Sequence, residues 1–462
     1  EQAWRYRDYV IRSFNEDKAY DRFLMEQVAG DELWPEQSDA MQDAVAVWTL
    51  GEWQNALDAF PDMLEYVRRT DQVSTLSEVA LGLTVGCANC HNHKYDPVTQ
   101  RDYFGLEAIF AASETWNRNT KAKAWGKGER TAYRAVRHAE KPVPIHLLTR
   151  GELTKPTKLI APALPAFLPG GGALPSGPDE NKQRRAQLAR WLVSPQNPLP
   201  ARVIANRVWQ WHFGQALAST PNDLGTQGEP PSHPELLDWL AADFRDSGGS
   251  LKSLHRRIVT SDTYRQAITA NSAAEKIDSG NTLLWRQNRR KLEAEALRDA
   301  ILAVSGKLDL TMGGPGWQDF VIERPEHSPH FRYDLANPEN PATWRRSIYR
   351  FVARSQTQPW MTSLDCADPS MRVDKRNESL SALQALALLN NGFMLTQAGF
   401  LAERVSRERP DLPAQVDRAC ALVLGRPPTV AERARLLAYA RAEGLPATCR
   451  VLLNLNEFVF AD

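Results

Sequence analysis

Two cysteines and a histidine in close succession are the most chemically distinctive residues of this sequence. Cys87, Cys90 and His91 form a Cys-x-x-Cys-His motif, which has the spacing of a c-type haem attachment site. Two thiols three residues apart can both reach the vinyl groups of one porphyrin, and the next residue can then bind the iron. The motif predicts haem c, with thioethers at Cys87 and Cys90 and with His91 as the iron ligand.

Other chemistries also fit this segment. His93 and Asp96 follow in the same loop, so Cys87, Cys90, His91, His93 and Asp96 form an alternative ligand set for zinc or another divalent metal. Against a structural zinc site, the chain has no second Cys-x-x-Cys pair. The two cysteines also fit a disulfide or thioredoxin-like pair, although the usual βαβ context is missing, or free buried thiols. The sequence leaves these alternatives open.

Residues elsewhere give weaker signals. Cys420 and Cys449 lie on apolar helical faces, which is typical of core thiols. His212 is surrounded by tryptophan and phenylalanine, so we expect it in an aromatic core cluster rather than in a ligand set. His327 and His330 have a loop spacing compatible with metal binding but lack a third ligand. The chain has no Gly-x-Ser-x-Gly, P-loop or His-Glu-x-x-His motif, so no reaction is indicated.

The composition is that of an ordinary globular protein. The 462 residues are 42% hydrophobic and 24% charged, a length that suggests roughly two to four domains. Because 56 Lys and Arg balance 56 Asp and Glu, broad contact with phosphates is disfavoured, and we expect no nucleic-acid partner. No apolar run approaches the roughly 18 residues of a membrane span. We therefore expect no membrane span in this chain.

Hydrophobic periodicity indicates a mainly α-helical protein with minor β structure. In the first part of the chain we expect helices at 4–14, 20–28, 44–60, 62–69, 73–83 and 100–110, and the cysteine motif lies between the last two. An exposed excursion is expected at 117–130 and a short strand at 141–149. A Pro/Gly-rich connector at 162–182 then separates two helical domains, 1–161 and 183–462.

The second domain is again mostly helical, with helices expected at 289–304, 381–405 and 430–443. Ser232 and Glu235 match the Ser-x-x-Glu pattern of a capping box, which predicts a helix whose N-cap is Ser232. Residues 347–354 contain several β-branched and aromatic side chains, so they indicate a strand.

Several longer stretches match the patterns of two known families. In the first domain, the stretch 81–97 contains the cysteine motif, and it is flanked by similar stretches at 3–11, 14–23 and 100–103. These resemble the planctomycete cytochrome-associated domain DUF1549, or PSCyt2, and we expect the start of that domain to be missing here. The second domain resembles its usual companion, DUF1553 or PSD1. The stretches that carry this second resemblance are 197–214, 228–239, 288–295, 384–390 and 452–458.

The resemblance implies an exported bacterial protein of the periplasm or cell envelope, in families often encoded with c-type cytochromes. We expect electron transfer through haem c with a c-type cytochrome module or another redox partner, linked to oxidation of an extracytoplasmic carbohydrate ligand. The alternative is a metal- or disulfide-stabilised module that binds a glycan or protein without redox activity. The families define no reaction, so enzymatic activity is left undecided. The chain begins at Glu1 without an apolar leader, and we expect the signal segment upstream.

Overall fold

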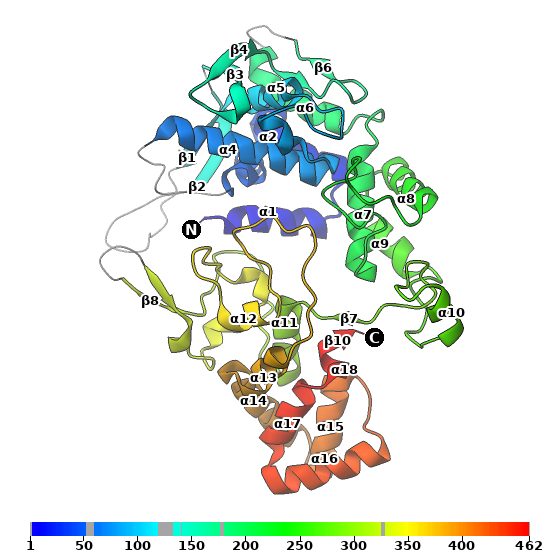
Figure 1. The fold of residues 1–462 in the computed structure, drawn as a ribbon. Coiled ribbons are helices and arrows are strands. Elements are labelled where there is room, and N and C mark those ends of the chain that lie inside the picture. The colour runs from blue at the N-terminus through cyan, green and yellow to red at the C-terminus, as the bar shows by residue number, and fades with distance from the viewer. Residues whose placement is uncertain are drawn as a thin grey trace. The chain divides into compact units, whose positions relative to one another are not determined.

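The chain forms two compact, mainly helical units with a few short strands (Figure 1), which confirms the predicted fold class. The computed structural model describes residues 2–51, 60–118, 133–139, 141–175, 180–324 and 329–461. Unit 1 comprises Glu1–Gln266 and Asn271–Trp285, and unit 2 comprises Ala267–Ala270 and Arg286–Asp462.

The α-helices are distributed over both units. Those of unit 1 are α1 (Trp4–Asn15), α2 (Tyr20–Leu33), α3 (Ser38–Val45), α4 (Pro61–Leu76), α5 (Gln100–Phe110), α6 (Arg184–Leu192), α7 (Leu199–Phe213), α8 (Pro234–Asp246), α9 (Leu251–Val259) and α10 (Ser272–Ile277). Those of unit 2 are α11 (Ala294–Ser305), α12 (Pro359–Ser363), α13 (Ala382–Asn390), α14 (Gly392–Glu408), α15 (Leu412–Leu424), α16 (Val430–Glu443), α17 (Leu445–Leu453) and α18 (Asn456–Val459).

The strands pair in twos, and every described pair is antiparallel. In unit 1, β1 (Ser113–Arg118) pairs with β2 (Tyr133–His138), β3 (Ile145–Leu148) with β4 (Pro156–Ile160), and β5 (Ala163–Leu164) with β6 (Gly172–Ala173). In unit 2, β7 (Arg290–Lys291) pairs with β10 (Phe460–Ala461), and β8 (Val321–Glu323) with β9 (His330–Arg332).

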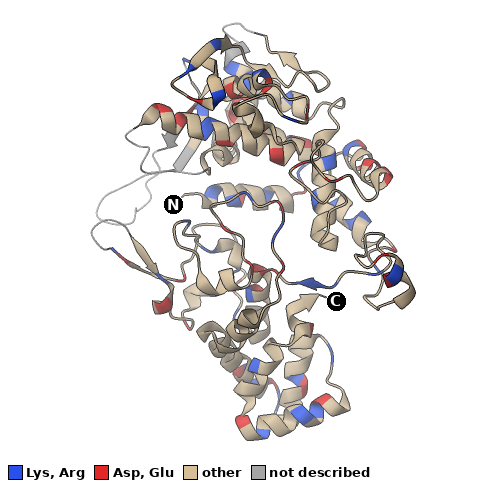
Figure 2. Cartoon of the chain, viewed as in Figure 1, with Lys and Arg blue, Asp and Glu red and all other residues tan. Residues whose placement is uncertain are grey.

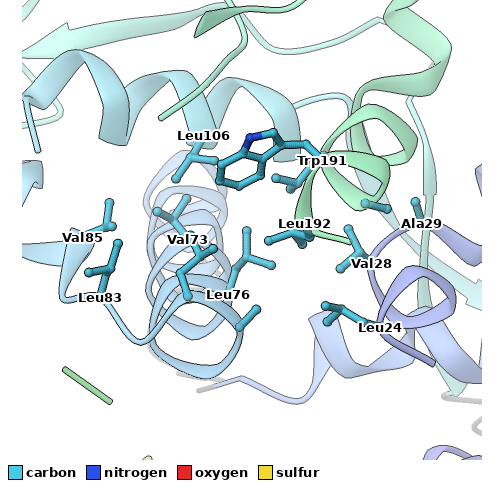
Figure 3. Packing of buried hydrophobic residues seen from close by; sticks show 14 of the residues in the cluster. Leu24, Val28, Ala29, Val73, Leu76, Leu83, Val85, Leu106, Trp191 and Leu192 are labelled. Carbon is cyan, nitrogen blue, oxygen red and sulfur yellow. The ribbon is translucent and has the colours of Figure 1, made fainter. Parts of the chain in front are cut away.

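The core of unit 1 is an apolar cluster to which α2, α4, α5 and α6 all contribute (Figure 3). Each helix turns one apolar face toward it because its large hydrophobic residues recur at helical spacing. The labelled members are Leu24, Val28, Ala29, Val73, Leu76, Leu83, Val85, Leu106, Trp191 and Leu192. Leu83 and Val85 immediately precede the cysteine motif, so this core fixes the start of the motif's loop.

A buried arginine joins α6 to α2. Arg185 has no exposed surface, and its guanidinium donates to both carboxylate oxygens of Asp31 at 2.8 and 2.7 Å. Glu32 lies 3.1 Å from the same guanidinium and also accepts the backbone N–H of Ala186 at 2.9 Å. Two carboxylates therefore compensate the buried charge, as such a position requires.

The predicted connector at 162–182 packs onto unit 1 where it is described. Its β5–β6 hairpin lies against α5, and the Asp102 carboxylate accepts the backbone N–H of Ala166 at 2.8 Å. Trp191 of α6 donates its indole N–H to Pro169 at 2.9 Å. The chain passes from unit 1 to unit 2 near residues 267–286, so unit 1 contains the first predicted domain, the connector and about the first hundred residues of the second.

The local predictions hold where the periodicity is strong. The helices expected at 100–110 and 430–443 are α5 and α16, and the one expected at 289–304 begins later, as α11. The stretch 381–405 forms two helices, α13 and α14, rather than one. The strand expected at 141–149 is β3. Most of the excursion expected at 117–130, and residues 52–59 of the helix expected at 44–60, lie outside the described residues.

Two local predictions are wrong. The N-cap of α8 is His233, not Ser232, and the Ser232 hydroxyl lies 3.0 Å from the Nδ1 atom of His233. Pro234 has the fixed φ and the missing N–H that suit the first helical position, so it moves the cap to the residue before it. Residues 347–354 form a short 3-10 turn at Ser347–Tyr349 instead of a strand. The Asp299 carboxylate accepts both the backbone N–H and the hydroxyl of Ser347 at 2.7 Å, which holds the turn.

Charged residues of both signs are interspersed along the helices of each unit (Figure 2). Among the described residues, no single helix has the length and apolar composition needed to cross a membrane. Helices α13 and α14 meet that test only as a pair, across a bend of 52°.

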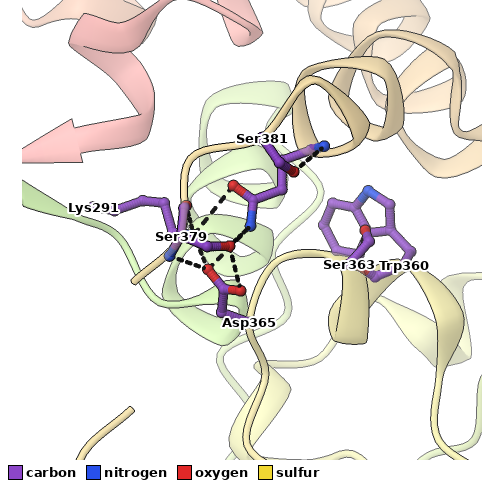
Figure 4. A network of polar contacts seen from close by, with 7 residues as sticks. Lys291, Trp360, Ser363, Asp365, Ser379 and Ser381 are labelled. Atoms are coloured by element: carbon purple, nitrogen blue, oxygen red, sulfur yellow. Dashed lines mark hydrogen bonds and ion pairs between the residues drawn. The ribbon is translucent and has the colours of Figure 1, made fainter. Parts of the chain in front are cut away.

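Unit 2 contains a network of polar contacts (Figure 4). Asp365 lies at its centre, where it pairs with Lys291 and accepts hydrogen bonds from the backbone and hydroxyl of Ser379, both 2.8 Å. Gln384 of α13 adds a third donor at 3.0 Å. Partial burial opposes ionisation of Asp365, but these donors outweigh it and lower its pKa to about 2. The network joins β7, the turn at 365 and the start of α13.

We predict that Asp365→Asn destabilises unit 2 by about 2–3 kcal/mol at pH 7, because the buried Lys291 ammonium loses its counter-charge. The ordinary pKa of Asp365 is 3.8 and the folded value is about 2. Its contribution is therefore complete above about pH 4 and is lost as the pH falls toward 2. Urea unfolding, followed by hydrogen exchange in α13, should show the wild-type and variant curves converging below pH 4.

The matched control is Asp417→Asn, which removes the carboxylate of an exposed pair with Arg433 in the same unit. It should leave the unfolding midpoint nearly unchanged, because exposed pairs contribute little. Equal effects of the two substitutions, or a gap between Asp365→Asn and wild type that does not narrow as the pH falls from 4 to 2, would contradict the assigned role of Asp365.

Candidate functional site

The cysteine motif begins in a short helical segment whose inner face is buried. Residues Val85–Asn89 form a 3-10 helix, and Val85, Ala88 and Asn89 point into unit 1. Cys87 and Cys90 lie on the other face and are exposed. The chain then runs without regular structure to Thr99, which begins α5 with a capping box to Asp102. The loop is therefore anchored at both ends by regular structure.

Three residues of the motif, Cys87, Cys90 and His91, are exposed, and we call them the exposed triad. Both cysteines are free thiols in the structure. The Nδ1 atom of His91 lies 2.7 Å from the backbone oxygen of Asn92. Since a carbonyl oxygen can only accept, Nδ1 carries the proton and Nε2 keeps its lone pair. Metal-bound histidines commonly have this arrangement, with one nitrogen held by a carbonyl and the other free to bind.

His93 and Asp96 point inward, and we call them the buried pair. His93 is 8% exposed, and its Nδ1 atom accepts the backbone N–H groups of Asp96 at 2.9 Å and of Tyr95 at 3.3 Å. Its Nε2 atom, which must then carry the proton, lies 3.3 Å from the Thr84 hydroxyl. Both ring nitrogens are therefore used within the loop, and neither has a free lone pair for a metal.

Asp96 holds the loop against a distant segment of unit 1. Its carboxylate accepts the backbone N–H of Thr226 at 2.7 Å. Gly225 allows this approach, because a Cβ atom there would lie 2.6 Å from the carboxylate. Leu224 also donates its N–H to the Gly82 carbonyl at 2.7 Å. The cysteine loop thus rests on the segment that joins α7 to α8.

A buried polar group supports the motif from beneath. The Asn89 amide donates to the Tyr103 hydroxyl at 2.9 Å, and its oxygen lies 2.9 Å from the Tyr66 hydroxyl. Burial raises the pKa of Tyr103, so it stays protonated. Gly151 passes directly over this group with φ of 71°, and a Cβ there would lie 2.8 Å from the Cys90 sulfur. A glycine at this point leaves the thiol uncovered.

The five candidate ligands therefore separate into two groups. Cys87, Cys90 and His91 are exposed at the surface. His93 and Asp96 are buried, and both accept backbone hydrogen bonds within unit 1. In the part of the chain that the structure describes, no group of three or more His, Cys, Asp or Glu side chains is arranged to hold a metal ion. Tyr66, Gly151 and Thr226 were not identified from the sequence, because each reaches the loop only through the fold.

The other candidates lie apart from the loop. Cys420 and Cys449 are buried in the core of unit 2, as predicted. His212 lies in the expected aromatic cluster of unit 1, with its Nε2 atom 2.7 Å from His255 Nδ1. His330 is exposed at the start of β9, and His327 lies outside the described residues.

Comparison with known families settles the relationship. The family model described as a protein of unknown function, DUF1553 or PSD1, matches residues 184–440. The chain belongs to the PSD1 family. The model described as a protein of unknown function, DUF1549 or PSCyt2, matches residues 1–115, so both halves of the suspected pair are present. No curated protein and no solved structure matches the chain significantly.

The family assignment places the motif and its support in different segments. The exposed triad and the buried pair belong to the PSCyt2 segment, whereas Gly225 and Thr226 belong to the PSD1 segment. The contact between Asp96 and Thr226 therefore joins the two families within unit 1. Neither segment alone contains all the residues that hold the loop.

We predict that Asp96→Ala loosens both partners of this contact, because the N–H of Thr226 loses its acceptor. Hydrogen exchange of peptides covering 82–98 and 223–228 should accelerate about tenfold or more, which corresponds to one hydrogen bond to a charged group. Asp96→Asn retains an accepting oxygen and should change exchange less. Unchanged exchange at 223–228 in Asp96→Ala would show that the contact does not hold the loop.

Proposed function

We propose that the exposed triad is a covalent attachment site for haem c and that this PSD1 protein is an exported electron-transfer protein. The observation that carries the proposal is the division of the loop. The three residues of the haem motif are available at the surface, while the two additional residues that a non-haem metal site would need are consumed by internal hydrogen bonds.

The donor chemistry of the triad fits this group. Each thioether forms when a thiol adds across a vinyl double bond, with sulfur on one carbon and hydrogen on the other, so the addition needs no oxidant. Cys87 and Cys90 are exposed free thiols, as this addition requires. His91 would bind the iron through Nε2, because Nδ1 is held by the Asn92 carbonyl. Haem bound there would supply one-electron transfer.

The rest of the loop keeps the triad in place. The Asn89 group with its two tyrosines and the contact of Asp96 with Thr226 hold the backbone at two points, and the Asn92 carbonyl orients the His91 ring. A backbone fixed in this way keeps the two thiols and the imidazole in constant relative positions during attachment. Gly151 contributes by leaving the side of Cys90 open.

The setting of the function follows from its chemistry and from the family. Bacterial thioether attachment takes place outside the cytoplasm, so a haem-loaded protein would be exported to the periplasm or cell envelope. The electron partner we propose is a c-type cytochrome module, and oxidation of an extracytoplasmic carbohydrate is the process we propose it serves. A protein with zinc at Cys87, Cys90, His91, His93 and Asp96 is the competing outcome, and it would require the buried pair to turn outward.

The test is expression in a host with a cytochrome c maturation system. The wild-type protein should retain haem on a denaturing gel and give a pyridine haemochrome spectrum. Cys87→Ala and Cys90→Ala should each reduce covalent loading, since each removes one thioether. His91→Ala should keep attachment but change the Soret band, because the iron loses its imidazole. His93→Ala should leave attachment in place and lower stability instead.

Cys366→Ala is the matched thiol control. Cys366 is half-buried in unit 2, and its thiol donates to Glu295 at 3.5 Å, with burial raising its pKa to about 11. Its loss should not affect haem loading. Wild-type protein from the same host that lacks a Soret band and holds stoichiometric zinc, lost on His93→Ala or Asp96→Ala, would overturn the proposal.

A further inference from the structure

Unit 1 brings two histidines into direct contact although they are 43 residues apart in the sequence. His212 lies in the last turn of α7, His255 lies in α9, and the Nε2 atom of His212 is 2.7 Å from the Nδ1 atom of His255. Both side chains are half-buried, so water reaches them. We call His212 and His255 the histidine pair. It lies outside the cysteine loop and has no part in the proposed haem attachment.

The short distance within the histidine pair means that both ring nitrogens are directed at the same point. One nitrogen must carry a proton, and the other must accept it through a lone pair. If the donor ring moves its proton to its other nitrogen, both rings stay neutral and two lone pairs face the same point. Zinc bonds to imidazole nitrogen at about 2.0–2.1 Å, so two such nitrogens on one ion lie roughly 3 Å apart. The two nitrogens are therefore close to the separation that one ion needs.

Packing on both sides holds the two rings in place. The rings of His212 and Tyr264 meet nearly at right angles, with their centroids 5.4 Å apart. Phe213, the next residue of α7, and Leu254, which precedes His255 in α9, are both buried in the core of unit 1. Side chains on packed helices are positioned more precisely than side chains on loops. The fold therefore fixes the positions of both ring nitrogens.

The charges beside the histidine pair favour a bound cation. Asp17, in the turn between α1 and α2, acts electrostatically on His255. Its carboxylate accepts the Ser250 hydroxyl at 2.5 Å and the backbone N–H of Lys252 at 3.0 Å, which keeps it at the start of α9. The Lys252 ammonium donates to the backbone oxygen of Asn15 at 2.6 Å. Burial lowers the pKa of His255, although Asp17 opposes this, so the ring is neutral at pH 7, as a metal ligand must be.

The chemistry of the histidine pair suits a transition metal, because imidazole nitrogens bind zinc, nickel and copper well. We propose that the pair binds one divalent transition-metal ion, which joins α7 to α9. In the described part of the chain, no third His, Cys, Asp or Glu side chain completes a ligand set here. Water therefore occupies the remaining positions around the ion, and binding is reversible. The site is separate from the exposed triad and does not depend on haem.

The test uses the full chain with Cys87→Ala and Cys90→Ala, so that a failure of haem attachment cannot affect the result. Calorimetric titration with ZnCl₂ at about pH 7.5 should show one bound ion per chain. His212→Ala and His255→Ala should each weaken zinc binding at least about tenfold, since each removes one ligand. Binding should also weaken as the pH falls to about 5.5, because the rings take up protons. In nitrogen-15 NMR, Zn²⁺ should shift the resonances of His212 Nε2 and His255 Nδ1.

His233→Ala is the matched control, because His233 is also half-buried in unit 1 and its Nδ1 atom lies 3.0 Å from the Ser232 hydroxyl. It should leave zinc binding unchanged. If an alanine variant of the pair does not fold, His255→Gln removes the imidazole and keeps a side chain that can form a hydrogen bond. The proposal is overturned if the parent protein binds no Zn²⁺ at millimolar concentration, or if the substitutions of His212 and His255 leave zinc binding intact. In either case the pair is a hydrogen bond within unit 1 and nothing more.

Discussion

The packing of unit 1 depends on Arg185, whose charged guanidinium is completely buried. Burial opposes ionisation of Arg185, but Asp31 and Glu32 outweigh it and raise its pKa. Loss of either the arginine or its carboxylates would leave the remaining charges buried without compensation, a change that typically costs about 3–5 kcal/mol. The guanidinium geometry also fixes direction, because a two-point contact with Asp31 holds α6 in one orientation on α2.

The position of the cysteine motif follows from that junction through successive contacts. Helix α6 carries Trp191 and Leu192 into the core, where they meet Val73 and Leu76 of α4. The chain after α4 continues through the same core to Val85, two residues before Cys87. Because Leu83 and Val85 are packed into the core, the chain is held at the surface when it reaches Cys87. A rigid frame beneath an open surface is what a covalently attached group needs.

The sequence predicted the elements but only part of the site. Helix α16 and the apolar face of α5 follow from spacing within a single stretch, and such information is local. The N-cap of α8 depended on two competing signals, the capping-box pattern of Ser232 and the preference of Pro234 for the first helical position. The Ser-x-x-Glu pattern alone does not show which signal wins. At the site, Cys87, Cys90 and His91 are recognisable from their spacing. From the sequence alone, His93 and Asp96 were also candidate metal ligands, because the same atoms can bind a metal or accept a backbone N–H. For Asp96 the position of Thr226, 130 residues away, decides which it does, and for His93 the backbone N–H groups of Tyr95 and Asp96 decide it.

The contact between Asp96 and Thr226 also bears on how these families evolve. A boundary between family models is a boundary between stretches of similar sequence, and here it does not coincide with the division between the two compact units. A substitution at Gly225 in the PSD1 segment would disturb the cysteine loop of the PSCyt2 segment. A substitution at Asp96 in the PSCyt2 segment would likewise disturb the PSD1 segment near Thr226. In this chain the two segments therefore share a structural constraint. Recombination that exchanged one of them between distant homologues would have to carry the matching loop with it.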